Sequence, residues 1–309
     1  MISLKQHIKE SFKIGRNKMT DIYNYQPNTR DELREIIKNR LEKDLNANLN
    51  DIDVSQITDM SYLFHELNPH NIDISEWDVS KVENMRYMFE VCNNFNCDLS
   101  NWNVSNVKNI SYMFYKCYDF NCDLSNWNVS NVTNMKYMFR NCSNFKGKGL
   151  ENWNVSKVKN MANMFEGCEK FEGKGLENWD VSNVRDMSGM FMNCKKFEGK
   201  ELENWDVLKV IDMLGMFYKC ENFNCDLSRW DVSNVENMYY MFYDCEKFEG
   251  KGLENWDVSN VRDMSGMFYD CENFNCDLSN WNVSNVKNMS YMFKNCKSLK
   301  NKPSWYKVW

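Results

Sequence analysis

One pattern of apolar and polar positions repeats along most of the chain. Tryptophan returns at intervals of 25 or 26 residues, and a cysteine follows each of these tryptophans at a fixed distance. The tryptophans of this column are Trp77, Trp102, Trp127, Trp153, Trp179, Trp205, Trp230, Trp256 and Trp281. A repeat of this length predicts a solenoid, in which each unit is stabilised by stacking on its neighbours.

Two periods follow one another within each unit. Trp102 and Val104 are two residues apart, the spacing of one face of a strand. The run from Ile110 to Cys117 has apolar residues at i, i+3, i+4 and i+7, the spacing of one face of a helix, and Asn109 stands where a helix cap is expected. The pattern therefore predicts an α/β repeat solenoid of about ten coils, each with a short parallel strand and a short helix. The Trp, Met, Phe and Cys columns are expected to be core.

The N-terminal region departs from the repeat. Thr29 and Glu32 form a capping-box pattern ahead of a helical apolar stripe that reaches Leu45. Residues 1–50 are therefore expected to form a helical cap. The amphipathic stretch over residues 1–18 is interpreted as part of this cap in preference to a membrane contact.

The solenoid is expected to span residues 51–300, and residues 301–309 form a C-terminal stub. Trp305 begins a further coil that stops at Trp309, and no capping helix follows it. Two alternatives remain at this end: the last aromatic residues fold over it, or it meets another molecule.

Composition narrows the functional classes. The formal net charge of −6 argues against a nucleic-acid partner, and no apolar run approaches the length of a membrane span. The 13 cysteines follow the repeat instead of a pairing scheme, so they are expected to be reduced and buried. A disulfide between Cys97 and Cys122, in adjacent coils, is the less favoured alternative. No spacing indicates a metal site, a cofactor or a catalytic motif.

The repeat also resembles a known family. The motif W-[DN]-V-S-x-V-x-[ND]-M-x-x-M-F-x-x-C-x-x-F recurs over about residues 51–300. It resembles the BspA-type leucine-rich repeats, in particular the Trp- and Met-rich subtype of bacterial surface proteins. The resemblance implies a leucine-rich-repeat-like solenoid that binds proteins, with surface adhesins among its relatives, and it carries over no catalytic residues.

An acidic row is the first candidate site. The residue after each tryptophan is Asp or Asn and is expected to face outward. Four aspartates stand in consecutive coils: Asp180, Asp206, Asp231 and Asp257. Because like charges at this spacing repel, a basic partner or a cation would stabilise the row. The alternative is that the Asp and Asn side chains serve the main chain or form ladders between coils.

An apolar patch in one coil is the second candidate. Leu208, Ile211 and Leu214 occupy columns that are Ser, charged or mixed in other coils, so they are expected to lie along one edge. Tyr218, Tyr243 and Tyr269 are expected to stack beside them. A contiguous exposed apolar patch is typical of a contact site, although local repacking that buries it is the alternative.

The sequence therefore predicts a protein-binding scaffold, not an enzyme, with an unidentified protein as partner. The alternative function is an assembly element that self-associates through its ends or an edge, as the aromatic C-terminal end indicates. The absence of a signal-peptide pattern and the expected reduced cysteines favour the cytoplasm. Export to the cell surface by a non-standard route is the alternative location.

Overall fold

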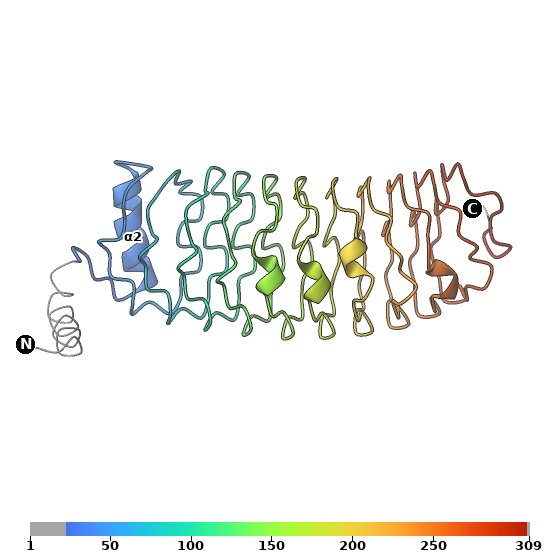
Figure 1. The fold of residues 1–309 in the computed structure, drawn as a ribbon, viewed down its shortest axis with the longest axis horizontal. Coiled ribbons are helices and arrows are strands. Elements are labelled where there is room, and N and C mark those ends of the chain that lie inside the picture. The colour runs from blue at the N-terminus through green and yellow to red at the C-terminus, as the bar shows by residue number, and fades with distance from the viewer. Residues whose placement is uncertain (1–22, 308–309) are drawn as a thin grey trace, which may run out of the picture.

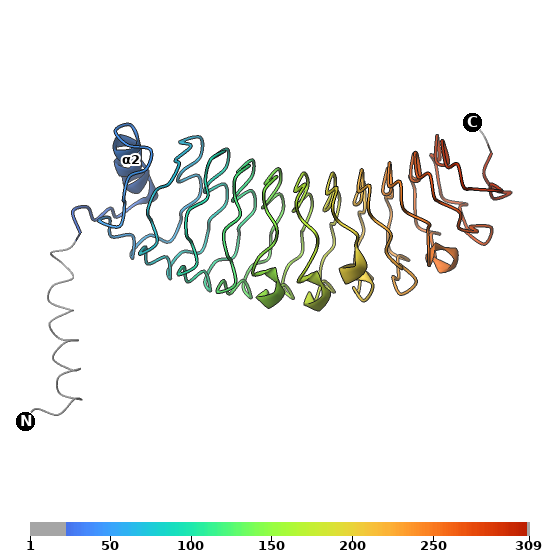
Figure 2. The same ribbon diagram turned by 45° about the horizontal axis from the view of Figure 1, so that its top comes forward.

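The computed structural model describes residues 23–307 as an elongated rod of stacked coils (Figure 1). Successive coils lie side by side in chain order, and the rod bows so that its two ends turn toward the same side (Figure 2). The predicted repeat solenoid is confirmed. The predicted amphipathic stretch of residues 1–18 and the terminal Trp309 lie outside the described residues.

An α-helix, α2 (Arg30–Leu41), closes the N-terminal end of the rod. The Thr29 side chain accepts a hydrogen bond from the main-chain N–H of Glu32 at 3.2 Å, as the capping-box pattern predicts. One face of the helix is buried in the apolar core that continues into the coils. The stripe predicted to reach Leu45 is shorter, because the helix ends at Leu41 and Leu45 is exposed.

The strand and the helix predicted for each coil are both wrong. The segment Trp102–Val104 forms no bridge, and the parallel bridges instead join the Asn109 column, one residue per coil, from Asp59 to Asn288. The run of residues 110–117, predicted as a helix, is a succession of turns. We call residues 110–117 and their equivalents in the other coils the turn ladder.

Main-chain N–H groups in the turn ladder alternate between two kinds of acceptor. The N–H groups of Tyr112 and Phe114 donate to carbonyls of the next coil at 2.9 and 3.0 Å, whereas that of Met113 donates three residues back within its own coil. Positive φ angles at Tyr112 (59°) and Lys116 (60°) allow this alternation. All ladder N–H groups that cross between coils therefore point toward the C-terminal end, and the carbonyls that receive them point toward the N-terminal end.

The bridging Asn or Asp residue holds the start of each turn. The side-chain Oδ1 of Asn109 accepts the main-chain N–H of Ser111 at 3.0 Å, and the equivalent bond is present in all ten coils from Asp59 to Asn288. Such Asx turns supply a side-chain acceptor to an otherwise unpaired N–H. The column predicted as a helix cap is therefore a turn-forming column.

The core consists of apolar columns that run the length of the rod. Trp77 and Trp102 stack in parallel with ring centroids 6.3 Å apart, and the indole N–H of Trp102 donates to the Ile74 carbonyl at 3.0 Å. The Trp, Val, Met, Phe and Cys columns are buried in the interior coils, which confirms the predicted core. Burial of each such large apolar side chain contributes about 2 kcal/mol.

All 13 cysteines are free thiols. The Sγ of Cys117 donates to the carbonyl of Phe89 in the preceding coil at 3.0 Å, and the same bond recurs along the column. The Cys97–Cys122 disulfide is absent, and the Cys122 thiol instead donates to the Cys97 carbonyl at 2.7 Å.

Short 3-10 helices mark the loops of the longer units and lie along the outer side of the bow (Figure 2). They are η2 (Leu150–Asn152), η3 (Leu176–Asn178), η4 (Lys200–Leu202) and η5 (Leu253–Asn255). Gly149 precedes η2 at φ 97°, and a Cβ there would lie 2.2 Å from the Ser125 nitrogen. Only glycine fits such a turn against the preceding coil.

Candidate binding surface

The apolar patch of Leu208, Ile211 and Leu214 lies on the surface. Leu208 is 42 % exposed and Ile211 is 43 % exposed, while Leu214 is half-buried. The repeat produces this exposure, because the same columns hold Ser105 and Lys108 in another coil. Local repacking has not buried the patch, and the exposure predicted for Leu208 and Ile211 is confirmed.

Leu214 lines a shallow hollow of about 440 Å³ together with Tyr239, Glu236 and Arg262. The guanidinium of Arg262 pairs with the Glu236 carboxylate at 3.3 Å. This ion pair neutralises its own charges, and Asp263 adds a further carboxylate to the lining, so the hollow offers an apolar and aromatic wall beside an acidic edge.

Tyrosines extend the surface away from the patch. Tyr218 and Tyr243 stack with ring centroids 4.6 Å apart, and Tyr243 and Tyr269 at 4.8 Å, as predicted. Tyr239 and Tyr240, which the sequence analysis missed, connect this stack to Leu214: their rings lie 4.0 Å apart, and Tyr240 contacts Tyr243 at 5.0 Å. The signal was the adjacent pair of tyrosines, of which Tyr239 occupies the column of Leu214 in the next coil.

The aromatic surface is uncharged at neutral pH. Interaction with the neighbouring Tyr240 hydroxyl, together with burial, raises the pKa of Tyr239 to about 12. Burial also raises the pKa of Tyr243. Both phenols therefore remain protonated and can donate hydrogen bonds to a partner.

The acidic row of Asp180, Asp206, Asp231 and Asp257 is exposed, and the main chain uses one oxygen of each carboxylate. Asp206 accepts the main-chain N–H of Leu208 at 3.1 Å, which places the row beside the apolar patch. The other three make the same bond at 3.0–3.1 Å. The second oxygen of each accepts no hydrogen bond from residues 23–307. Side chains of a different column form the hydrogen bonds between coils: the Asn106 side-chain amide donates to the Ser80 carbonyl of the preceding coil at 2.7 Å.

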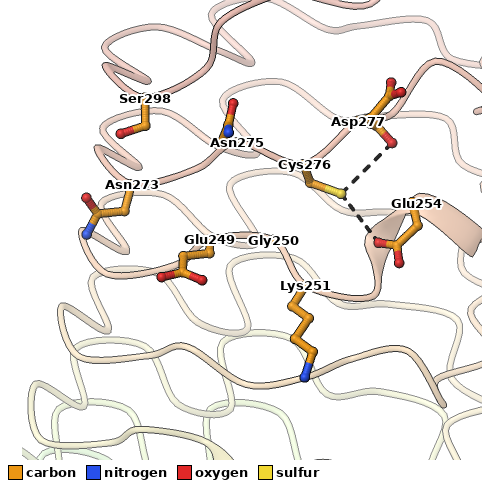
Figure 3. Close-up of a pocket in the computed structure, with 9 residues that line it drawn as sticks. All are labelled: Glu249, Gly250, Lys251, Glu254, Asn273, Asn275, Cys276, Asp277 and Ser298. Carbon is orange, nitrogen blue, oxygen red and sulfur yellow. Dashed lines mark hydrogen bonds between the residues drawn. The ribbon is translucent and has the colours of Figure 1, made fainter.

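A larger hollow of about 760 Å³ lies near the C-terminal end and is polar (Figure 3). Its one thiol, Cys276, lies 3.6 Å from a Glu254 carboxylate oxygen and 4.0 Å from the Asp277 carbonyl. Burial and the Glu254 charge raise the pKa of Cys276 to about 12. The sulfur is therefore a protonated hydrogen-bond donor at neutral pH, and not a thiolate nucleophile.

Within residues 23–307 no group of three or more His, Cys, Asp or Glu side chains is arranged to hold a metal ion. No helix in that range is long and apolar enough to cross a membrane.

These features define a repeat solenoid with an exposed apolar, aromatic and acidic surface on its middle coils. The chain belongs to the DUF285 family, described as a Mycoplasma protein of unknown function, whose model matches residues 31–151, 133–253 and 228–308. No functionally curated protein matches the chain.

Two solved structures are similar in outline. A leucine-rich repeat protein from Eubacterium ventriosum is 14 % identical over 83 % of this chain and 78 % of its own, with a TM-score of 0.41. The TLR13 chain of a TLR13–ssRNA13 complex is 12 % identical over 89 % of this chain and 52 % of its own, with a TM-score of 0.27. Both similarities are too low to support an argument about function.

Proposed function

We propose that the protein is a scaffold that binds another protein through the apolar patch and the acidic row beside it. The observation that carries the proposal is the exposure of Leu208 and Ile211 three residues apart in one coil. Binding energy concentrates where apolar side chains are removed from water at the centre of a contact. Asp206 and its neighbours in the row favour a partner that presents basic residues around an apolar segment.

The triple variant Leu208→Ser, Ile211→Lys and Leu214→Ser tests the proposal. We expect it to fold like the parent, because exposed substitutions change stability by only about 0.5 kcal/mol. We expect the affinity for the partner to fall roughly 30-fold, as for the loss of about 2 kcal/mol at a contact centre. Proteins captured from the source organism by immobilised parent and variant are compared first, and the affinity of the identified partner is then measured by calorimetry.

The matched control is Thr133→Lys with Lys136→Ser. It introduces the same residues, Lys and Ser, in the Ile211 and Leu214 columns of a distant coil. A partner held by the parent and the control but lost by the triple variant supports the proposal. Equal binding by a folded triple variant removes the patch as the site. Changing the four aspartates of the acidic row to Asn leaves an oxygen that still accepts the main-chain N–H two residues ahead. We expect this variant to bind the partner more weakly, and its affinity to depend less on salt.

We also propose the finer assignments that the repeat motif indicates. The Trp- and Met-rich unit supports a BspA-type protein, with an adhesin-like role as one form of protein binding. The free cysteines suit a reducing compartment such as the cytoplasm, with the cell surface as the alternative. Fractionation of cells with an antibody against the chain tests the location.

Self-association through the ends is the alternative function, supported by apolar columns that become half-buried in the last coil, at Val283 and Met289. One feature counts against head-to-tail stacking: α2 closes this end of the rod (Figure 1), and its Arg34 donates to the carbonyls of Leu63 and His65, so part of the carbonyl edge of the first coil is already bonded. Light scattering across concentrations separates this alternative from a monomeric scaffold.

A further inference from the structure

The last coil presents a row of unpaired main-chain N–H groups. In the preceding coil Met264 and Phe268 donate to carbonyls of the last coil at 2.9 and 3.0 Å. Three of the equivalent N–H groups of the last coil find no acceptor within residues 23–307. They belong to Met289, Tyr291 and Asn295, which we call the donor row, whereas the Phe293 N–H faces the Tyr306 hydroxyl.

Positive charge concentrates around the donor row. After Asp277 the sequence contains six lysines and no Asp, Glu or Arg, although the whole chain has a net charge of −6. Lys287 and Lys294, both exposed, belong to the same stretch as the row. The nearest acids lie in the preceding coil and are engaged there: Asp270 accepts the Asn295 side-chain amide at 2.6 Å, and Glu272 pairs with Lys297 at 2.5 Å.

Apolar surface also remains at this end. Met289 and Leu299 belong to columns that are fully buried in the interior coils but are half-buried here. Trp305 stacks on Trp281 at 6.3 Å and covers part of the coil. The end therefore combines hydrogen-bond donors, positive charge and a partly covered apolar face.

The chemistry of the end selects its partner. Two such ends placed face to face would oppose donors to donors and lysines to lysines. In the first coil of another copy, α2 covers the end (Figure 1), and Arg34 already bonds the ladder carbonyls of Leu63 and His65. The edge of an ordinary β-strand presents N–H and C=O groups in alternation. If such a strand lay against the donor row, some N–H groups of the row would face N–H groups of the strand. Carboxylate oxygens accept N–H bonds without that constraint, and lysines favour them further.

We propose that the C-terminal face, formed by the donor row with Lys287 and Lys294, binds an acidic polypeptide segment of another molecule. The carboxylates of the segment accept the three N–H groups and pair with the lysines. This contact is separate from the apolar patch, so a patch variant that loses its own partner is expected to retain this one.

The test uses the full chain and a labelled ten-residue oligoglutamate peptide, with oligoglutamine of the same length as the neutral probe. We expect fluorescence anisotropy to report binding of the acidic peptide only, weakening as salt rises. Hydrogen–deuterium exchange of the donor row should slow when the peptide is bound. Lys287→Gln with Lys294→Gln should weaken binding roughly 3- to 30-fold.

Lys159→Gln is the matched control, because Lys159 is an exposed residue in the Lys287 column of an interior coil. Equal affinities for parent and double variant, protection elsewhere in the chain, or no binding of the acidic peptide would overturn the proposal. Tighter binding of single-stranded DNA of equal charge would assign the face to nucleic acid instead. Concentration-dependent dimerisation unaffected by the lysine changes would assign it to a second copy.

Discussion

At the scale of single residues, short polar side chains shape each coil. Asn109 and Asp206 stand in different columns, yet each accepts the main-chain N–H two residues ahead. This shared geometry explains why Asn and Asp interchange in both columns: the bond needs one carbonyl-type oxygen and no charge. The charge of the acidic row is therefore surplus to folding, and its second oxygens are available to a partner.

Glu201 breaks the pattern of its column. The equivalent positions hold Gly149, Gly175 and Gly252 at φ of 91–97°, and in the coil of Glu201 the 3-10 helix η4 begins two residues earlier in the unit. One carboxylate oxygen of Glu201 is buried without a hydrogen-bond partner in the described chain. Burial and the charges of Glu177 and Glu198 raise the pKa of Glu201.

We expect Glu201→Gln to stabilise the protein at pH 7 by roughly 0.5 kcal/mol, because water partly screens a half-exposed carboxyl. A raised pKa in the folded state means that the parent is most stable below about 4.5, the ordinary value, and loses stability as pH rises through the folded pKa. The difference between the melting temperatures of parent and variant should therefore shrink as the pH is lowered toward 4. The exposed Glu203→Gln is the control, and an equal gain from it would contradict the explanation.

At the scale of elements, the sequence predicted α2 correctly and the coil interior incorrectly. The capping box of Thr29 and Glu32 is a local signal, so it survives in the fold. The Ile110–Cys117 spacing satisfies a helix period, but it also fits turns whose inward residues fall at the same intervals. Glycine exposes the difference: Gly189, like Gly215 and Gly266, shares a column with Tyr112, and a column shared by Gly and Tyr indicates positive φ.

Arg34 matches the polarity of the turn ladder. The ladder leaves carbonyls at the N-terminal end, and the Arg34 guanidinium donates to two of them, those of Leu63 and His65. We expect Arg34→Met to lower the free energy of unfolding by about 2 kcal/mol, because the carbonyls lose their donors under the cap. Lys38→Met, on the exposed side of the same helix, should change it by less than about 0.5 kcal/mol.

Urea unfolding followed by circular dichroism measures both variants, and hydrogen–deuterium exchange locates the effect. The first coil should exchange faster in Arg34→Met while the middle coils remain protected, since stability in a solenoid is local. Equal losses from the two variants would show that Arg34 contributes only as a charge on the helix.

At the scale of the whole molecule, the candidate surface was only partly predictable. Substitutions against the repeat identified Leu208 and Ile211, because a column average is visible in a single sequence. Tyr239 is also visible in the sequence, since it occupies the column of Leu214 one coil further on. The donor row was not visible in this way. It depends on the direction of the hydrogen bonds between coils, which follows from the φ alternation of the turn ladder and not from hydrophobicity.

Because the hydrogen bonds of the turn ladder run in the same direction between every pair of coils, we expect the rod to tolerate removal of one whole unit. Deleting residues 153–178 joins Asn152 to Trp179 and restores the sequence of an ordinary coil, so every crossing N–H again meets a carbonyl. We expect a folded protein about 5 Å shorter, since parallel chains stack at ~4.8 Å. Deleting residues 153–165 removes half a unit, so side chains of different columns would be stacked on one another. We expect this variant not to fold. X-ray scattering and circular dichroism compare the two deletion variants. If both fold equally well, the alignment of equivalent residues in successive coils is not the source of stability.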